Sequence, residues 1–128
     1  MSTAPTELLF SYGTLQYTRV QIAHFGRELT GREAALPGYT RRVAPVLDPK
    51  VAALIGESQY ANVEPGSRED AVPGIVFEVT AQELADADKY EAAAGYHRIS
   101  AMLESGDQAW VYIRNRRYIW CCRRSSQH

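Results

Sequence analysis

The chain has few cysteines and no long apolar run. None of its 128 residues belongs to an apolar stretch approaching the roughly 18 needed to cross a membrane. The first ten, MSTAPTELLF, lack the basic start and long apolar segment of a secretory signal, so no membrane partner is expected. Cys121 and Cys122 are adjacent, which disfavours a disulfide between them, because that bond normally needs Cα atoms farther apart than about 3.8 Å. Two unpaired thiols predict a reducing compartment, the cytoplasm.

Familiar metal, nucleotide and nucleophile motifs are missing as well. The sequence contains no C-x-x-C or H-E-x-x-H pattern, and its three histidines are far apart at positions 24, 97 and 128. It also contains no G-x-S-x-G, no phosphate-binding P-loop and no G-x-G-x-x-G. We therefore expect no metal site and no cofactor, and we expect any chemistry to use a carboxylate.

The charges are unevenly distributed although the net charge is only −1. Residues 114–128 hold five arginines and no acid, whereas all 15 acidic residues come earlier. We interpret the basic tail from about residue 116 as a solubilising or loosely docked segment. A nucleic-acid contact is the alternative for this tail, but the acidic body would repel a polyanion and no recognition module precedes the tail. No nucleic-acid partner is expected.

Length and composition predict a single domain over residues 1–128, with 45% hydrophobic and 23% charged residues. Two short helices are predicted by capping boxes at 18–21 and 80–83, with ends at Gly26 and Gly95. Strands are expected at 8–12, 34–46 (broken by a Pro-Gly turn), 59–63, 74–79, 97–103, 110–113 and 118–122. The fold class is therefore α+β, as a mostly antiparallel curled sheet or small β-barrel with two short helices.

Glu91 is the most informative carboxylate. On the helix expected from residue 81 to about 94, it falls on the same face as the apolar Leu84, with Asp88 one turn before it. Burial, the like charge of Asp88 and the negative end of the helix dipole would all raise its pKa, which suits a general acid or base near neutral pH. In the alternative reading, Glu91 lies at the helix flank and pairs with Arg98 or Lys89.

A second feature lies where the first strand meets the first helix, at Tyr12-Gly13-Thr14-Leu15. Gly13 allows the backbone to turn and a ligand to approach closely. Successive N–H groups just before a helix start favour a carboxylate or an oxyanion. The alternative is a plain turn between a strand and a helix.

Four segments in order resemble the γ-glutamylcyclotransferase-like superfamily, and most closely its γ-glutamylamine cyclotransferase and avirulence-induced-gene-like branch. They are Y-G-T-L at 12–15, A-L-P-G-Y at 35–39, V-P-G-I-V-F-E-V at 72–79, and D-K-Y-E at 88–91 with Tyr96 following. The resemblance covers about residues 8–115. The sequence departs from the family pattern at Ala92, where a glycine is frequent, and at Ala87, where a larger hydrophobic residue is usual.

The resemblance implies a small barrel with flanking helices and a cavity at one end. It implies an enzyme that releases 5-oxoproline from a γ-glutamyl amine or γ-glutamyl peptide by intramolecular acyl transfer. Glu91 would be the catalytic acid and base. The substrate-binding residues would be Tyr12 and Tyr96 by their side chains and Gly13, Thr14 and Leu15 by their backbone.

Two other functions remain open at this stage. A non-enzymatic binding module for a small molecule or a peptide is one alternative on the same fold, since fold does not imply function. A thiol enzyme using Cys121 or Cys122 is the other reading, because neighbouring arginines lower a thiol pKa. The presence of Glu91 within its motif favours the cyclotransferase over both.

Overall fold

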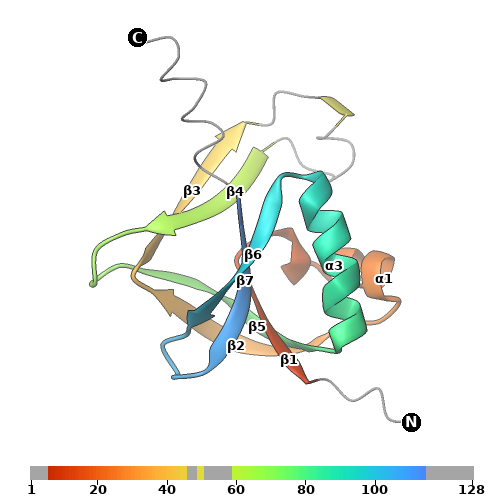
Figure 1. Cartoon of the computed structure of the whole chain (residues 1–128), viewed down its shortest axis with the longest axis horizontal. Helices are drawn as coiled ribbons and strands as arrows, with labels where there is room; N and C mark the ends of the chain where they lie inside the picture. Colours follow the sequence, from red (N-terminus) through yellow and green to blue (C-terminus); the bar gives the residue numbers. More distant parts are fainter. Residues whose placement is uncertain (1–5, 46–48, 51–58, 115–128) are drawn as a thin grey trace.

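The computed structural model describes residues 6–45, 49–50 and 59–114. These residues form an α+β fold with two helices and a mostly antiparallel sheet (Figure 1). The elements are β1 (Glu7–Ser11), η1 (Thr14–Gln16, a 3₁₀ turn), α1 (Thr18–Phe25), β2 (Thr30–Pro37), β3 (Tyr39–Pro45), β4 (Gln59–Pro65), β5 (Ala71–Val79), α3 (Ala81–Ala93), β6 (Tyr96–Met102) and β7 (Gln108–Arg114). Neither of these helices is long and apolar enough to cross a membrane. The strand predicted at 118–122, the basic tail from about 116, Cys121 and Cys122 lie outside the described residues.

Five strands form the main sheet in the order β2-β5-β1-β7-β6. β1 lies at its centre, antiparallel to β5 and parallel to β7. At Gly74 of β5, an added Cβ would collide with the Phe10 ring and the Ser11 carbonyl, so glycine lets β5 lie close against the end of β1. The close fit holds the last residues of β1, immediately before the Tyr12 turn, against the sheet.

The predicted barrel is wrong, because the main sheet is not closed within the described residues. Its edge strands are β2 and β6. At Gly38, with a φ of 83°, the chain turns from β2 into β3, which pairs with β4 as a separate ribbon instead of extending the sheet. The loop after β6 reaches β2 through a bond from the Glu104 N–H to the Ala35 carbonyl (2.9 Å), so the two edges approach without forming a ladder.

The capping box predicted for the second helix is confirmed. The Thr80 hydroxyl accepts from the Glu83 N–H (3.0 Å), and the Glu83 carboxylate accepts from the Thr80 N–H (2.9 Å). Gly95, with a φ of 90°, follows the helix as expected. These two signals fix where α3 begins and ends, and therefore which of its residues face the sheet.

The capping box predicted for the first helix is wrong. The residue that precedes α1 is Tyr17, which makes no side-chain cap, and Thr18 is already helical. Gln21, expected to complete the box, is instead buried: its amide donates to the Leu15 carbonyl (2.8 Å) and accepts from the Leu29 N–H (2.8 Å). Gln21 thus ties η1 to the segment after α1, because a buried amide needs both partners.

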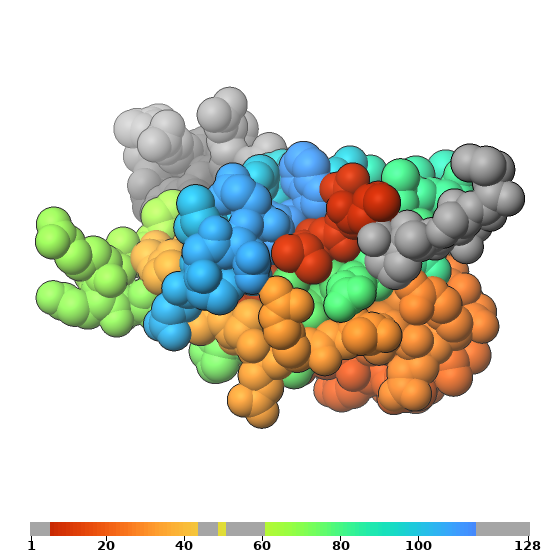
Figure 2. Space-filling view, turned by 90° about the horizontal axis from the view of Figure 1, so that it is seen from below, coloured from red at the N-terminus to blue at the C-terminus, as the bar shows by residue number. Residues whose placement is uncertain are grey.

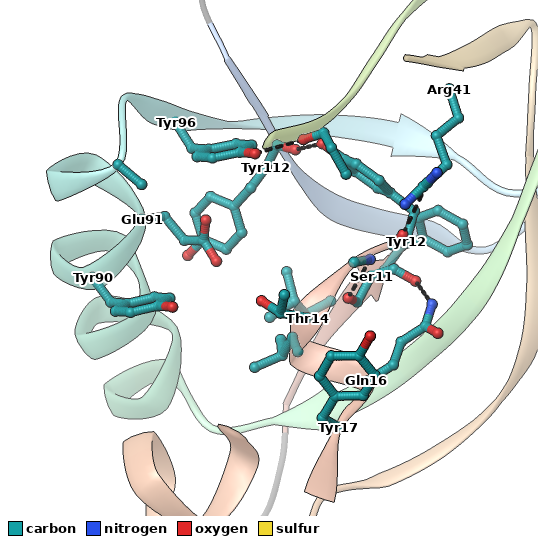
Figure 3. Close-up of a pocket in the computed structure, with 16 residues that line it drawn as sticks. Ser11, Tyr12, Thr14, Gln16, Tyr17, Arg41, Tyr90, Glu91, Tyr96 and Tyr112 are labelled. Atoms are coloured by element: carbon teal, nitrogen blue, oxygen red, sulfur yellow. Dashed lines mark hydrogen bonds between the residues drawn. The ribbon is translucent and has the colours of Figure 1, made fainter. Parts of the chain in front are cut away.

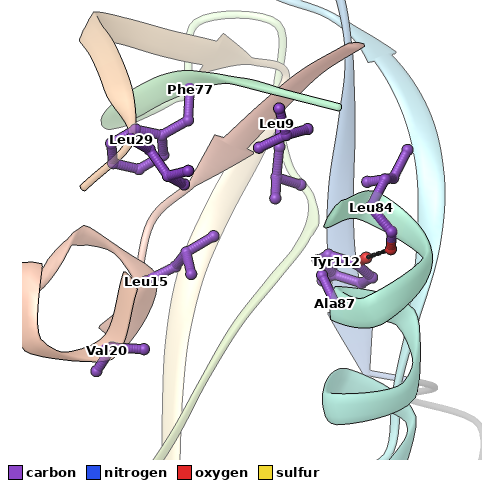
Figure 4. Close-up of a cluster of buried hydrophobic side chains, with 9 residues drawn as sticks. Leu9, Leu15, Val20, Leu29, Phe77, Leu84, Ala87 and Tyr112 are labelled. Carbon is purple, nitrogen blue, oxygen red and sulfur yellow. Dashed lines mark hydrogen bonds between the residues drawn. The ribbon is translucent and has the colours of Figure 1, made fainter. Parts of the chain in front are cut away.

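The main sheet has a hydrophobic core on each face, as expected when side chains alternate along a strand. One core lies between the sheet and the helices (Figure 4) and contains Leu9, Leu15, Val20, Leu29, Phe77, Val79, Leu84, Ala87 and Tyr112. The other faces the β3–β4 ribbon and contains Phe10, Leu36, Val63, Val72, Val76, Leu103, Ala109 and Val111. The turn between β4 and β5 protrudes from one end of the molecule, at the left of Figure 2.

Candidate active site

A cavity of about 210 Å³ lies where the chain leaves β1 and enters η1 (Figure 3). It is lined by residues 9–17, Arg41, Ala61, Tyr90, Glu91, Ala94, Tyr96 and Tyr112. All six residues named from the sequence as site residues are among them. The end of β1, with the turn and the η1 segment that follow it, supplies one side, α3 supplies another, and β3, β4, β6 and β7 supply one residue each.

Glu91 lies on the last turn of α3 and points into the cavity (Figure 3). Its burial raises the pKa of the carboxyl from 4.5 to about 7. The alternative pairing with Arg98 is wrong, because Arg98 binds Asp88 instead. Among the residues described, no cation lies within the 4.0 Å of an ion pair with Glu91. A carboxyl in this state exchanges a proton readily near neutral pH.

Asp88, one turn earlier, is held by two neighbouring strands. Arg98 of β6 donates to its two oxygens at 2.9 and 3.0 Å, and the Tyr112 hydroxyl of β7 donates at 2.7 Å. Burial acts to raise the pKa of Asp88, but the bonds from Arg98 and Tyr112 outweigh it and hold the pKa below its usual value. The like-charge effect expected on Glu91 is therefore offset, because Arg98 balances the charge of Asp88.

Three tyrosines surround Glu91 and each donates its hydroxyl to a protein acceptor. Tyr12 donates to the Tyr112 carbonyl (2.6 Å), Tyr96 to the Ala61 carbonyl (2.5 Å) and Tyr112 to Asp88. Burial, reinforced for Tyr12 by Tyr96 and Glu91, raises the pKa of Tyr12, and burial with the bond to Asp88 raises that of Tyr112. Both phenols stay neutral, and with their protons committed elsewhere their oxygens can act toward an amine only as acceptors, Tyr12 beside a hydrogen bond from the Val63 backbone.

The turn at 12–15 carries the backbone groups that were predicted to bind a ligand. Gly13 has a φ of −139° and a ψ of −143°, and its N–H donates to the Ser11 hydroxyl (3.3 Å). An added Cβ at Gly13 would meet nothing closer than the Ala61 Cβ at 4.0 Å, so the space beside this backbone is open. Thr14 and Leu15 open the η1 turn, so their N–H groups have no carbonyl partner within it. These two N–H groups remain as the donors for a ligand.

The structure adds cavity residues that were not predicted from the sequence. Arg41 of β3 donates its Nε–H to the Tyr12 carbonyl (3.3 Å) and lies beside the turn (Figure 3). Tyr90 packs on His24 of α1 with ring centroids 3.8 Å apart. Tyr112 was assigned only to a strand. Nothing in the sequence places β3 beside the 12–15 turn, whereas the position of Tyr90 next to Glu91 was a usable signal.

In the described parts of the chain, no group of three or more histidine, cysteine, aspartate or glutamate side chains is placed to hold a metal ion. The cavity contains one carboxylate, and the other acid nearby is already bound to Arg98.

The chain belongs to the γ-glutamyl cyclotransferase, AIG2-like family, whose family model matches residues 9–127. The resemblance inferred from the four motifs is confirmed, and the match extends past residue 115, where the resemblance was expected to end. Membership indicates a cyclotransferase-like enzyme with a small-molecule substrate. A search of curated protein sequences finds no match to the chain.

Solved structures share the fold. The solution structure of At5g39720.1 from Arabidopsis thaliana is 23% identical, with a TM-score of 0.66 over 86% of this chain and 69% of its own. The crystal structure of an uncharacterized human protein, loc79017, is 18% identical, with a TM-score of 0.64 over 89% of this chain and 68% of its own. A structure titled gamma-glutamyl cyclotransferase is 15% identical, with a TM-score of 0.64 over 85% and 66%. At these identities the likeness concerns the fold.

Proposed function

We propose that the protein is a γ-glutamyl cyclotransferase that releases 5-oxoproline from a γ-glutamyl amine or γ-glutamyl peptide. The α-nitrogen of the substrate forms a bond to its own γ-carbonyl carbon, and the bond from that carbon to the leaving nitrogen breaks. The observation that supports this most directly is Glu91, a buried carboxyl with a pKa of about 7 that points into a cavity. It accepts the proton of the α-ammonium group and later delivers a proton to the leaving amine.

The rest of the cavity suits a reaction whose nucleophile is part of the substrate. Ring closure within one molecule mainly requires a fixed orientation, which contributes several kcal/mol to such reactions. The neutral Tyr12 oxygen accepts from the substrate amine, the Tyr96 hydroxyl oxygen accepts as well, and together they direct the amine toward Glu91. No enzyme nucleophile is needed.

The backbone of the 12–15 turn faces the remaining polar groups of the substrate. We assign the N–H groups of Thr14 and Leu15 to the α-carboxylate or to the oxyanion that develops on the γ-carbonyl. Gly13 acts by its lack of a side chain, which lets the ligand approach the backbone. The two adjacent cysteines, Cys121 and Cys122, support a cytoplasmic location for this reaction.

The proposal is tested by a screen for 5-oxoproline release. Purified protein is incubated with γ-glutamyl amines, γ-glutamyl-ε-lysine and γ-glutamyl dipeptides, and 5-oxoproline is quantified by chromatography. Release from at least one class, abolished in Glu91→Gln, is the expected result. Binding of the same compounds without release would instead support the non-enzymatic binding module. Release that persists in Glu91→Gln and disappears in Cys121→Ser with Cys122→Ser would support the thiol reading.

The close approach at Gly13 has its own test. In Gly13→Ala the new methyl has room in the unliganded protein and should clash with no neighbour, and its activity is compared with that of the wild type at matched folded fraction. The methyl occupies space that the substrate needs, and we expect kcat/KM to fall about tenfold or more, which corresponds to roughly 1.4 kcal/mol. Glu33→Ala, on the exposed face of edge strand β2, is the control and should keep full activity. Full activity in Gly13→Ala would show that no ligand passes close to this backbone.

A further inference from the structure

Arg41 is an arginine of the cavity wall whose charge has no assigned use. It comes from β3, in the two-stranded ribbon, and its side chain reaches the turn at the end of β1 (Figure 3). Its Nε–H donates to the Tyr12 carbonyl at 3.3 Å, which directs the guanidinium toward the 12–15 turn. Four further N–H donors of the group, on the two terminal nitrogens, remain beyond this contact.

Its neighbour Arg42 behaves differently. Successive residues of a strand face opposite sides, and Arg42 binds Glu64 of β4 at 3.2 Å. Within the described residues, no carboxylate lies within the 4.0 Å of an ion pair with Arg41. The ribbon therefore holds one arginine already neutralised by the protein and one whose charge is directed at the cavity.

The charges of the cavity match those of the substrate class. Of the described residues that line it, Arg41 and Glu91 are the two that carry formal charges. They lie on different sides of the cavity (Figure 3). A γ-glutamyl group carries an amine and a carboxylate on one carbon atom. With the amine at Glu91, the carboxylate of a substrate held at the 12–15 turn faces the guanidinium.

We propose that Arg41 binds the α-carboxylate of the γ-glutamyl group, together with the Thr14 and Leu15 N–H groups, and that it thereby selects substrates with a free α-carboxylate. This inference rests on the proposed function. A guanidinium binds a carboxylate through two parallel hydrogen bonds, which fixes the orientation as well as the position of the group. Fixing the carboxylate also fixes the α-carbon, so that the amine is presented to Glu91 and the γ-carbonyl to the amine.

A pair of substrates and a pair of variants test this inference. The substrates are a γ-glutamyl amine that releases 5-oxoproline and its 4-aminobutyryl counterpart, which lacks the α-carboxylate and closes to 2-pyrrolidinone. For the γ-glutamyl amine, Arg41→Gln should lower kcat/KM about 10- to 100-fold, mainly through KM, the range expected for loss of charge-assisted hydrogen bonds. The kcat/KM of Arg41→Lys should lie between those of the wild type and Arg41→Gln. The kcat/KM of Arg42→Gln should stay within about twofold of the wild type.

The 4-aminobutyryl substrate distinguishes recognition from a structural effect. The wild type and Arg41→Gln should process it at equally low rates, because this substrate has no α-carboxylate for Arg41 to bind. An equal loss on both substrates would overturn the inference, as would full activity of Arg41→Gln on the γ-glutamyl amine.

A binding measurement separates failure of the inference from failure of the proposed function. Calorimetry of 5-oxoproline, with 2-pyrrolidinone as the uncharged analogue, requires no turnover. We expect Arg41→Gln, but not Arg42→Gln, to weaken 5-oxoproline binding at least tenfold and to leave that of 2-pyrrolidinone unchanged. Arg41-dependent binding without release of 5-oxoproline from any substrate would sustain Arg41 as a carboxylate site while rejecting the cyclotransferase. Release of 5-oxoproline that does not depend on Arg41 would support the cyclotransferase and reject Arg41 as the carboxylate site.

Discussion

Two carboxylates on one face of α3 have opposite surroundings. Asp88 faces β6 and β7, where Arg98 and Tyr112 donate to it and hold its pKa below the usual value. Glu91, one turn further along, faces the cavity, where burial raises its pKa to about 7. The difference shows that helical spacing brings the two acids together, but their partners in the sheet decide which one is held in an ion pair and which one has a raised pKa.

Strand register explains why only Asp88 is bound. Arg98 and Tyr112 are direct cross-strand partners in the β6–β7 pair, so their side chains share the face that α3 covers. Arg98 also packs over the Trp110 ring at 4.2 Å, which limits its reach. The next turn of α3 brings Glu91 past this pair and over the cavity. The Asp88 cluster is therefore a fixed anchor, and it places Glu91 without competing for its proton.

Replacing Glu91 should have the largest effect. Glu91→Gln keeps the shape of the side chain but removes the proton transfer, and we expect kcat for 5-oxoproline release to fall about 100-fold or more. Asp86→Asn is the matched control, since Asp86 lies on the exposed side of the same helix and accepts a hydrogen bond from Gln82. It should retain the wild-type rate. Comparable turnover in the two variants would refute the role of Glu91.

Glu91→Gln, which should lower activity, should raise the free energy of unfolding at alkaline pH. Because the pKa of Glu91 is 4.5 when exposed and about 7 when folded, the folded protein loses stability as the pH rises through this window. The Glu91 residue is not fully buried, so we expect a loss of about 2 kcal/mol in the free energy of unfolding rather than the full value for that shift. Urea titrations at pH 4.5 and pH 8 measure it. Glu91→Gln should lack this loss and exceed the wild type in stability at pH 8, and parallel pH profiles would exclude a raised pKa.

Local signals allowed much of the fold to be predicted from the sequence. The capping box at Thr80 and the stop at Gly95 placed α3 correctly, because both act through bonds between near neighbours. The motif residues from Tyr12 to Leu15, with Glu91 and Tyr96, were correctly chosen as lining one cavity, although their roles stay predictions.

Features that depend on distant contacts were predicted less well. The barrel was wrong because separation of the β3–β4 ribbon from the main sheet depends on pairing that no local pattern records. The predicted capping box at Thr18 was wrong because the Gln21 side chain is buried and hydrogen-bonded to the backbone of Leu15 and Leu29. Arg41 was missed for the same reason, since its place beside the Tyr12 turn depends on where the ribbon packs.

The smallest expected effect tests whether Arg98 shields Glu91 from Asp88. If Glu91 acts as a base, kcat/KM of the wild type should decline as the pH falls below about 7. In Arg98→Gln the charge of Asp88 is no longer balanced, and since the phenols of Tyr12 and Tyr112 are neutral and Arg41 is unchanged, this decline should begin about half a pH unit higher. Arg98→Gln with Asp88→Asn removes both charges and should restore the wild-type midpoint, whatever it does to the maximal rate. Lys89→Gln, which removes an exposed cation of the same helix, should not move it. A midpoint shared by all four proteins would show that Asp88 exerts no electrostatic effect on Glu91, with or without its arginine.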